Sequence, residues 1–251
     1  MKVHGDYHSN GYAHLEGLMP RPVAHEFLMQ LRASLEESKV PLRGFLREAQ
    51  MLKRPALEIY AQQYKPMLAF LWGLTPTMSE LTQRELLPTY SYFRVYREGD
   101  LCWVHSDRFA CEHSLSLTLA YSDGKAWPFE IGRDPISHVR PVETTFEEDP
   151  YNAVEMNVGD AILYKGVTYR HGRVTPNPNR WSAHMFLMFQ CGRVDVWPTG
   201  DYGVRMGFGR LYGLDPMPSA KELGPAGDPY RPYRSLVAWW CWRAADTTTP
   251  T

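Results

Sequence analysis

The chain has 251 residues, and its 27 Lys and Arg residues against 28 Asp and Glu residues leave a net charge of -1. This balance offers no overall electrostatic attraction to nucleic acid or to an anionic membrane, so we expect neither as a partner. A hydrophobic fraction of 44% with 13% aromatic residues is ample for a sizeable core, and we expect a single globular domain over residues 1–251.

Targeting signals and cysteine spacing indicate the compartment. The N-terminus has no apolar core of the signal-peptide kind, and no stretch approaches the run of about 18 apolar residues that a membrane-spanning helix needs. The four cysteines, at positions 102, 111, 191 and 241, show no CxxC spacing. This pattern argues against a zinc ribbon, an iron–sulfur site and a disulfide framework. The sequence predicts a soluble, cytoplasmic protein with reduced thiols.

Residues 1–88 are predicted to be mainly helical. A polar, poorly ordered lead-in over residues 1–10 precedes a short alternating strand at residues 11–18. A helix is then expected from near Pro22. Its buried face is predicted to comprise Val23, Ala24, Phe27, Leu28, Leu31 and Leu35. A second helix is expected over residues 55–72 with a kink near Pro66, and a third over residues 81–87, opened by the capping-box pattern Thr77 to Glu80.

The texture changes at Thr89, after which β-branched and aromatic residues predominate. The expected strands, separated by turn clusters, are TYSYFRVYREGD, CWVHSD, SLSLTLAY, WPFEI, AVEMNV, AILY and SAHMFLMF. Short strands at regular intervals predict a mainly β fold with helices. We expect a double-stranded β-helix, or jelly roll, of about eight strands over residues 89–192, covered on one side by the N-terminal helices.

Residues 193–251 are rich in Gly and Pro, and we predict an irregular C-terminal segment. Trp239, Trp240 and Trp242 are expected to pack this segment against the body of the domain, because Trp clusters are usually structural. Residues 244–251 are expected to be loose.

The stretch His105-Ser106-Asp107 carries the most chemistry. Alternate residues of a strand face the same way, so His105 and Asp107 can bind one ion while Ser106 points elsewhere. His171 is the expected third ligand. Two imidazoles and one carboxylate on one face of a metal leave the opposite face open, which is the facial triad of non-haem Fe(II) oxygenases.

Other histidines fit a metal site less well. His4 and Asp6 also form an HxD pattern, but at the extreme terminus, where chains tend to fray. We interpret His113, His138 and His184 as ordinary polar residues of a β-rich domain. Of these, His113 is the main rival to His171, because it lies only six residues after Asp107.

The wider pattern resembles a known family. It runs Tyr96-x-x-Gly99-x5-His105-x-Asp107, then Gly159-Asp160, His171 and Arg180-Trp-Ser182. Over residues 89–190, and weakly over residues 11–35, the chain resembles Fe(II)/2-oxoglutarate-dependent dioxygenases, with spacing closest to the prolyl-hydroxylase-like branch.

The resemblance implies a cofactor set and roles for the motif residues. Fe(II) would be held by the two histidines and Asp107, with 2-oxoglutarate taking two of the remaining positions and O2 the third. Arg180 would bind the far carboxylate of 2-oxoglutarate, because a guanidinium makes paired hydrogen bonds with a carboxylate. Ser182 would donate to the same carboxylate, and Tyr96 would border the pocket.

Strand alternation extends the inference beyond the motif. If Tyr96 points inward and no bulge intervenes, Tyr92 and Arg94 should line the same cavity. Two roles remain open for Arg94. It could bind a substrate anion, which is our hypothesis, or it could compete with Arg180 as the cosubstrate anchor.

The function implied by the resemblance is hydroxylation of an unactivated C–H bond in a small metabolite or amino-acid-like substrate, coupled to decarboxylation of 2-oxoglutarate to succinate and CO2. One alternative is a peptidyl or protein hydroxylase of the same family. Others are an iron oxidase independent of 2-oxoglutarate, a non-catalytic metal-binding double-stranded β-helix protein, and an interaction protein that uses its aromatic tail. The residues identify neither the substrate nor the oligomeric state.

Overall fold

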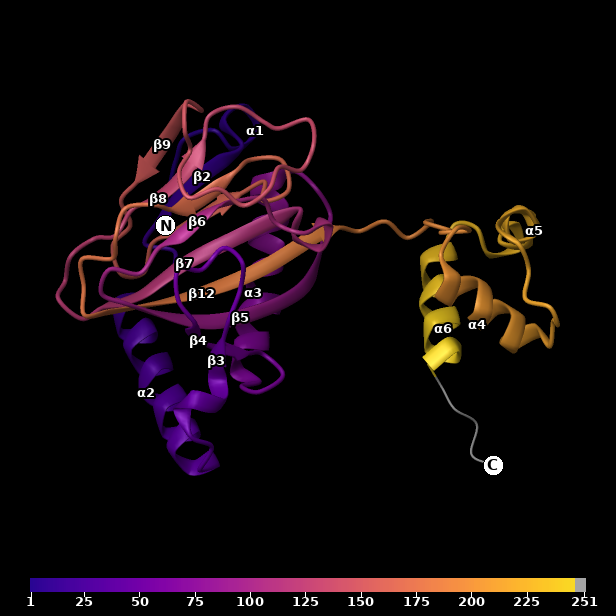
Figure 1. Cartoon of the computed structure of the whole chain (residues 1–251), viewed down its shortest axis with the longest axis horizontal. Coiled ribbons are helices and arrows are strands. Elements are labelled where there is room, and N and C mark those ends of the chain that lie inside the picture. The colour runs from indigo at the N-terminus through magenta and orange to yellow at the C-terminus, as the bar shows by residue number, and fades with distance from the viewer. Residues whose placement is uncertain (247–251) are drawn as a thin grey trace. The chain divides into compact units, whose positions relative to one another are not determined.

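The computed structural model describes residues 1–246 and divides the chain into two compact units (Figure 1). Unit 1 comprises Met1–Cys191 and unit 2 comprises Gly192–Thr251. This division differs from the single domain that we expected from the sequence. The sequence at the junction is not a Gly- or Ser-rich linker that would indicate a domain boundary, because Gly192 is followed at once by the mixed sequence RVDVW.

Unit 1 is built on two antiparallel sheets. Within the described residues, the larger sheet has the order β1-β2-β10-β7-β12-β5-β4-β3 and the smaller one β6-β11-β8-β9. The strands of the larger sheet are β1 (Lys2–His4), β2 (Tyr12–Glu16), β3 (Leu46–Arg47), β4 (Ala56–Tyr60), β5 (Leu86–Arg97), β7 (His113–Tyr121), β10 (Ala161–Tyr164) and β12 (Trp181–Cys191). Those of the smaller sheet are β6 (Cys102–His105), β8 (Phe129–Gly132), β9 (Tyr151–Val154) and β11 (His171–Arg173). The predicted jelly-roll class is confirmed.

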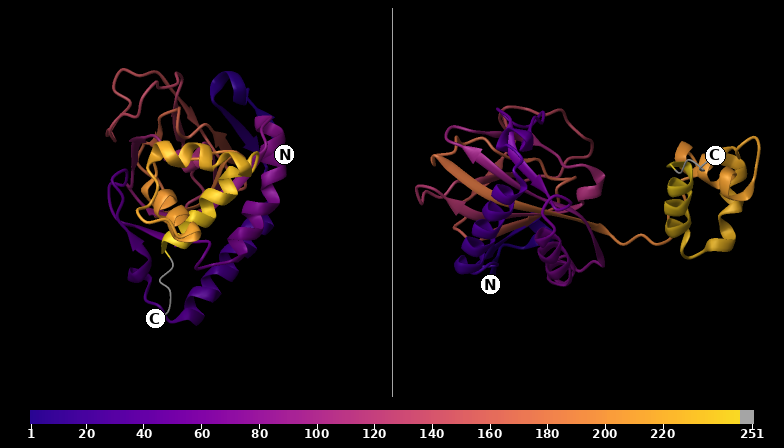
Figure 2. Two further views of the ribbon diagram at one scale, coloured as in Figure 1. Left: turned by 90° about the vertical axis from the view of Figure 1, so that its right-hand side faces the viewer. Right: turned by 90° about the horizontal axis from the view of Figure 1, so that it is seen from below.

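Strand β12, in the middle of the larger sheet, is buried on both faces, and its residues 185–189 are all apolar. In β12, Met185 and Leu187 belong to the core on the helix-covered face, whereas Phe186 and Met188 belong to a second cluster on the opposite face. Helices α2 (Arg21–Ser38) and α3 (Pro66–Thr82) lie on the outer face of this sheet (Figures 1 and 2). The other face is therefore left for a site between the sheets.

The N-terminal helices differ in detail from the prediction. In α2 the buried residues are Ala24, Phe27 and Leu31, whereas Val23 is exposed. The expected helices over residues 55–72 and 81–87 are replaced by strand β4 and one continuous helix, α3. Pro66 does not kink a helix; it lies in the first turn of α3, where its missing N–H costs nothing.

The first ten residues are more ordered than predicted. They form β1 and a short helix, α1 (Tyr7–Asn10), whose N-cap is Asp6. The Asp6 carboxylate accepts a hydrogen bond from the backbone N–H of His8 at 2.8 Å. The His4 ring lies 2.6 Å from the carboxylate of Glu16 on β2. Both members of the terminal HxD pattern thus have structural partners.

Unit 2 is helical, which corrects the prediction of an irregular segment. It contains α4 (Tyr202–Tyr212), α5 (Ala220–Ala226) and α6 (Arg234–Asp246), and α4 packs against α6. Its core comprises Val204, Phe208, Leu223, Ala238 and Cys241. The three tryptophans that we expected to be packed, Trp239, Trp240 and Trp242, lie on α6 with exposed fractions of 41% or more. Among residues 1–246, no helix has the length and apolar character needed to cross a membrane.

Gly159 lies just before β10, and its carbonyl oxygen accepts a hydrogen bond from the backbone N–H of Met19. Its position generates a prediction. Its φ of +94° is left-handed, and a Cβ there would meet the Met19 carbonyl oxygen at 2.2 Å. Gly124 has a similar φ of +68° but open space around it. Gly124→Ala should therefore cost only the backbone strain of about 1–2 kcal/mol, and Gly159→Ala a further steric cost of about 1–3 kcal/mol. Urea unfolding followed by circular dichroism measures both, and equal losses would contradict this account.

Candidate metal centre

The two histidines of the predicted triad lie opposite each other on neighbouring strands of the smaller sheet. The antiparallel register of β6 and β11 pairs His105 directly with His171, and their ring centroids are 4.5 Å apart. Because paired residues on adjacent strands project to the same side, both rings face the space between the sheets.

Asp107 lies two residues beyond the end of β6 and is fixed from two directions. Its backbone N–H donates to the Gly166 carbonyl at 2.8 Å, and its Oδ2 accepts from the Ser114 hydroxyl at 2.6 Å. Gly166 passes so close that a Cβ there would lie 2.1 Å from that same Oδ2. The carboxylate is thus held in one position by its neighbours.

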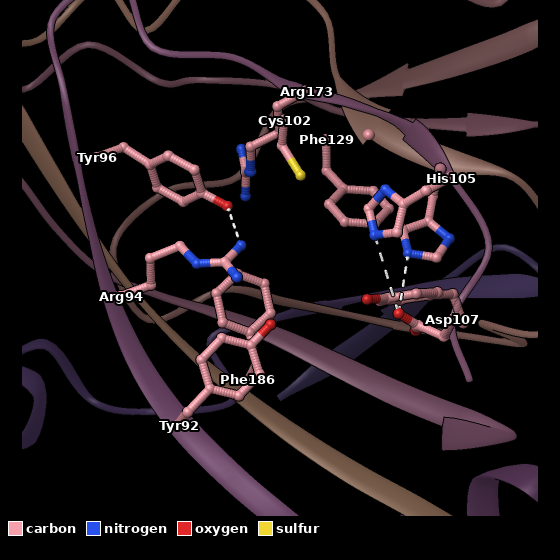
Figure 3. Close-up of a pocket in the computed structure, with 12 residues that line it drawn as sticks. Tyr92, Arg94, Tyr96, Cys102, His105, Asp107, Phe129, Arg173 and Phe186 are labelled. Atoms are coloured by element: carbon pink, nitrogen blue, oxygen red, sulfur yellow. Dashed lines mark hydrogen bonds and ion pairs between the residues drawn. The ribbon is translucent and has the colours of Figure 1, made fainter. Parts of the chain in front are cut away.

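Hydrogen bonds also orient the two imidazoles. Nδ1 of His105 lies 2.8 Å from the Trp103 carbonyl oxygen, and Nδ1 of His171 lies 2.9 Å from the Tyr169 carbonyl oxygen. A carbonyl only accepts, so each Nδ1 carries the proton and each Nε2 presents a lone pair. The two Nε2 atoms lie 3.9 and 3.6 Å from Asp107 Oδ1 (Figure 3).

The electrostatics favour the ligand forms of two of these groups. The pKa of His105 is lowered to about 4, mainly by burial and next by the nearby His171. Burial raises the pKa of Asp107, but His171 and the hydrogen bonds outweigh that effect and the pKa falls to about 2. At neutral pH the site therefore offers a neutral imidazole and a carboxylate, which are the forms that bind a divalent metal.

The donor set fits a metal ion. Ligand atoms of His105, Asp107 and His171 all lie within 4.8 Å of one another, and they form the one such group found in the described part of the chain. The rival histidines lie elsewhere. His113 contacts Tyr7, and buried His184 lies 3.2 Å from the Ser182 hydroxyl. With two nitrogen donors, one oxygen donor and one open side, the arrangement suits a catalytic Fe(II) site.

A small cavity adjoins the triad (Figure 3). Strand β5 contributes Tyr92, Arg94 and Tyr96 to its wall, as expected from the alternation of a strand. The other lining residues are Cys102, His105, Asp107, Phe129, Tyr164, His171, Gly172, Arg173 and Phe186. The cavity thus combines the proposed metal ligands with two guanidinium groups.

Arg94 is buried and already neutralised. Its Nη2 lies 2.6 Å from the Glu58 carboxylate on neighbouring strand β4, and its Nη1 donates to the Tyr96 hydroxyl at 2.8 Å. The Tyr60 hydroxyl donates to the other Glu58 oxygen at 3.1 Å. Breaking one partner of such a buried pair would leave an uncompensated charge, so the pair acts as a unit.

Arg180 and Ser182, which we expected to bind 2-oxoglutarate, do not line the cavity, and this corrects the sequence prediction. The Arg180 side chain is 74% exposed and pairs with Asp123, whose carboxylate accepts from both the backbone N–H and Nε of Arg180. Ser182 is buried but bonds to Asn177 and His184. The arginine precedes the first residue of β12, Trp181, so strand alternation does not bring it inward.

Arg173 is the residue that sequence reasoning missed. It lies two positions after His171 on β11, so the same alternation that identified Tyr92 and Arg94 predicts that it shares the face of the histidine. It is buried, and its guanidinium lies over the rings of Trp127 and Phe129.

A second cavity opens on the other side of Arg94. It is larger than the first, with which it shares Tyr92, Arg94, His105 and Asp107. Its other lining residues include Arg47, Glu48, Glu58, Tyr60, Tyr90, Ser106 and Arg108. The Ser106 hydroxyl is buried without a hydrogen-bond partner. An unsatisfied hydroxyl beside the proposed metal ligands is suited to bind a ligand group.

Comparisons with solved structures cover about three quarters of the chain. SnoK, described as a non-haem α-ketoglutarate-dependent carbocyclase from nogalamycin biosynthesis, is 12% identical with a TM-score of 0.59, covering 75% of this chain and 82% of its own. A Pseudomonas putida prolyl-4-hydroxylase is 14% identical with a TM-score of 0.52, covering 74% and 95%. HygX from Streptomyces hygroscopicus, solved with nickel and 2-oxoglutarate bound, is 8% identical with a TM-score of 0.51, covering 74% and 85%. The predicted fold resemblance is confirmed.

Sequence comparison gives a different set of relatives. The "Alkylbase DNA glycosidase-like protein mag2" of Schizosaccharomyces pombe is 31% identical over 64 residues, which are 26% of this chain and 30% of that protein. "DNA-3-methyladenine glycosylase 1" of the same yeast is 32% identical over 74 residues, 28% of this chain and 32% of that protein. The chain thus spans about a third of the length of these relatives. No protein-family model matches the chain.

The contact between Ser114 and Asp107 generates a prediction. Ser114→Ala removes the hydrogen bond that orients the carboxylate, and loss of such a support typically weakens metal binding about 10- to 100-fold. Ser116, two residues along the same strand, has a buried hydroxyl without a partner and is the matched control. Calorimetric titration with Ni(II) should show weaker binding for Ser114→Ala and unchanged binding for Ser116→Ala. Equal affinities for both variants would sink the proposed supporting role.

Proposed function

We propose that unit 1 is an Fe(II)- and 2-oxoglutarate-dependent oxygenase that hydroxylates an unactivated C–H bond of a small molecule. The observation that carries this proposal is the triad of His105, Asp107 and His171, placed between the two sheets beside a cavity with guanidinium groups. The shared fold with α-ketoglutarate-dependent proteins supports it.

The reaction balances as substrate C–H plus O2 plus 2-oxoglutarate giving substrate C–OH, succinate and CO2. Iron, when bound by the triad, supplies the oxidising chemistry, which the protein itself cannot perform. The chain's own residues bind and orient the reactants. The closely packed wall of aromatic rings around the triad, including Phe129, Tyr164 and Phe186, limits the access of water.

The second cavity is the proposed substrate site. It reaches His105 and Asp107, and it offers charged groups of both signs together with the free Ser106 hydroxyl. These features suit a small polar or zwitterionic molecule, in which each charge would find a partner. A peptidyl substrate is the alternative, and it requires the cavity to admit an extended chain. Testing free amino acids beside short peptides separates the two.

Turnover is the direct test. The wild-type chain, reconstituted with Fe(II), should release succinate from 2-oxoglutarate in the presence of O2, and a metabolite screen should find compounds that stimulate this release. Asp107→Ala removes a ligand and should abolish turnover, whereas Asp123→Ala, at the exposed turn, should retain it. Absence of succinate under all conditions would favour a non-catalytic metal-binding protein, and substrate oxidation without succinate would favour a 2-oxoglutarate-independent oxidase.

A second candidate function concerns unit 2, and the matches to the yeast proteins favour it. We infer that these matches fall mainly on unit 2, because they cover 26% and 28% of the chain while the structural matches cover about three quarters of it, as unit 1 does. By the names of these relatives, unit 2 would bind DNA that contains an alkylated base.

Features of unit 2 are compatible with this candidate. Residues 192–251 contain seven Lys and Arg residues and six Asp and Glu residues. Two of the seven, Arg231 and Arg234, are paired with Asp195, which reduces the number of cations available to phosphates. The exposed rings of Trp239 and Trp240 can stack on bases that have left the helix. We therefore expect binding that depends more on an unstacked base than on phosphate contacts.

Fluorescence anisotropy with a labelled duplex tests this expectation. The chain should bind a duplex with one methylated purine more tightly than the unmodified duplex. Because unit 2 offers a limited number of cations to phosphates, a plot of the logarithm of the binding constant against the logarithm of the salt concentration should have a slope less negative than about -5. Trp240→Ala should weaken binding, and the exposed Trp72→Ala of unit 1 is the control. No binding to either duplex would remove this candidate and restore the sequence prediction of no nucleic-acid partner.

A further inference from the structure

Arg173 carries a buried charge that no carboxylate in the described part of the chain neutralises at ion-pair distance. Its exposed fraction is 2%. Its Nη1 donates to the carbonyl oxygens of Trp127 at 2.6 Å and Pro128 at 3.0 Å, and its Nη2 lies 3.5 Å from Nδ1 of His184. These acceptors are neutral. They satisfy hydrogen-bonding capacity, but they do not compensate a full positive charge.

The carboxylate of Glu130 lies near enough to Arg173 to interact with it electrostatically, but it makes no ion pair with the guanidinium. Its oxygens accept from the backbone N–H groups of Val174 and Thr175 and from the Thr175 hydroxyl, the last at 2.6 Å. An arginine stays protonated even when it is buried, so its charge cannot be removed by loss of a proton. A buried cation of this kind is costly unless an anion joins it.

The three arginines near the site therefore differ in what they offer a ligand. Arg94 is matched by Glu58, and Arg180 is exposed and matched by Asp123. Arg173 alone among the three combines burial, a place in the wall of the metal cavity and an unmatched charge. Its guanidinium and that of Arg94 both point toward the Tyr96 hydroxyl (Figure 3).

Charge counting in the cavity points to a dianion. Counted over the charged groups that line the cavity and their ion-pair partners, a divalent metal with Asp107 leaves one positive charge, the pair of Arg94 and Glu58 contributes none, and Arg173 adds a second positive charge. A ligand with two carboxylates cancels this total if one carboxylate meets the metal and the other meets Arg173. 2-Oxoglutarate is such a ligand, and His171 and Arg173 lie on one strand face at alternate positions.

We propose that Arg173, and not Arg180, binds the far carboxylate of 2-oxoglutarate, a role that rests on the proposed function of unit 1. The position two residues after the second histidine places the anchor on the same strand as a metal ligand. Movement of β11 would then shift metal ligand and cosubstrate anchor together. The opposite reading is that the Arg173 side chain fills the cosubstrate space and excludes 2-oxoglutarate.

A ligand-and-variant cycle tests the proposal without relying on turnover. The full chain is loaded with Ni(II) and titrated calorimetrically with 2-oxoglutarate and with 2-oxopentanoate, in which a methyl group replaces the far carboxylate. The wild type should prefer 2-oxoglutarate by roughly 10- to 100-fold, as expected for hydrogen bonds to a charged group. In Arg173→Gln this preference should disappear, and in Arg180→Gln it should remain.

Arg173→Lys keeps the charge but loses the paired hydrogen bonds of a guanidinium, so its preference for 2-oxoglutarate over 2-oxopentanoate should be reduced. This variant replaces Arg173→Gln in the test if the Gln variant does not fold. A preference that survives in Arg173→Gln would overturn the assignment, and loss of it in Arg180→Gln instead would move the anchor to that residue. Tighter 2-oxoglutarate binding by Arg173→Gln would show that the side chain blocks the site. If wild type loaded with Ni(II) binds neither acid, the proposed function of unit 1 itself fails.

Discussion

The pairing of β6 with β11 is the constraint on which the site depends. It places His105 opposite His171, and the carbonyl oxygens of Trp103 and Tyr169 then set both rings in the orientation that presents Nε2. Asp107 follows where β6 ends and is held by Gly166 and Ser114. A one-residue slip between these strands would turn one histidine out of the cavity, so metal binding depends directly on the register of the two strands.

Burial of charge is the second organising element. The space between the sheets contains two guanidinium groups, and only one has a carboxylate partner in the described residues. Proteins rarely bury such groups without a compensating partner, and ligand sites are a common exception. The cavity is therefore prepared for an anion before any ligand arrives, and this preorganisation reduces the cost of binding. The larger cavity beyond Arg94 leaves separate room for a substrate.

Much of unit 1 could be predicted from the sequence because its signals are local. Alternation in SLSLTLAY and TYSYFRVY indicated strands and also the inward face that carries Tyr92, Arg94 and Tyr96. Alternation also placed His105 and Asp107 on one face, whereas His171 was identified by its position between Gly159-Asp160 and Arg180-Trp-Ser182. Arg180 was misplaced because its motif spacing is a linear signal, whereas its contact with Asp123 depends on a turn 57 residues earlier in the chain. Arg173 could have been found by applying alternation to β11. The helices of unit 2 were missed because their Gly and Pro content resembles that of loops.

The central claim is that the triad and Arg173 together form one binding site for a metal and a dicarboxylate. A crystal structure of the full chain with Ni(II) and 2-oxoglutarate tests it most directly. The account predicts metal bound by Nε2 of His105, Nε2 of His171 and the Asp107 carboxylate, with the far carboxylate of 2-oxoglutarate paired with Arg173. Metal bound elsewhere, or a carboxylate paired with Arg180 while Arg173 keeps only its carbonyl contacts, would contradict it.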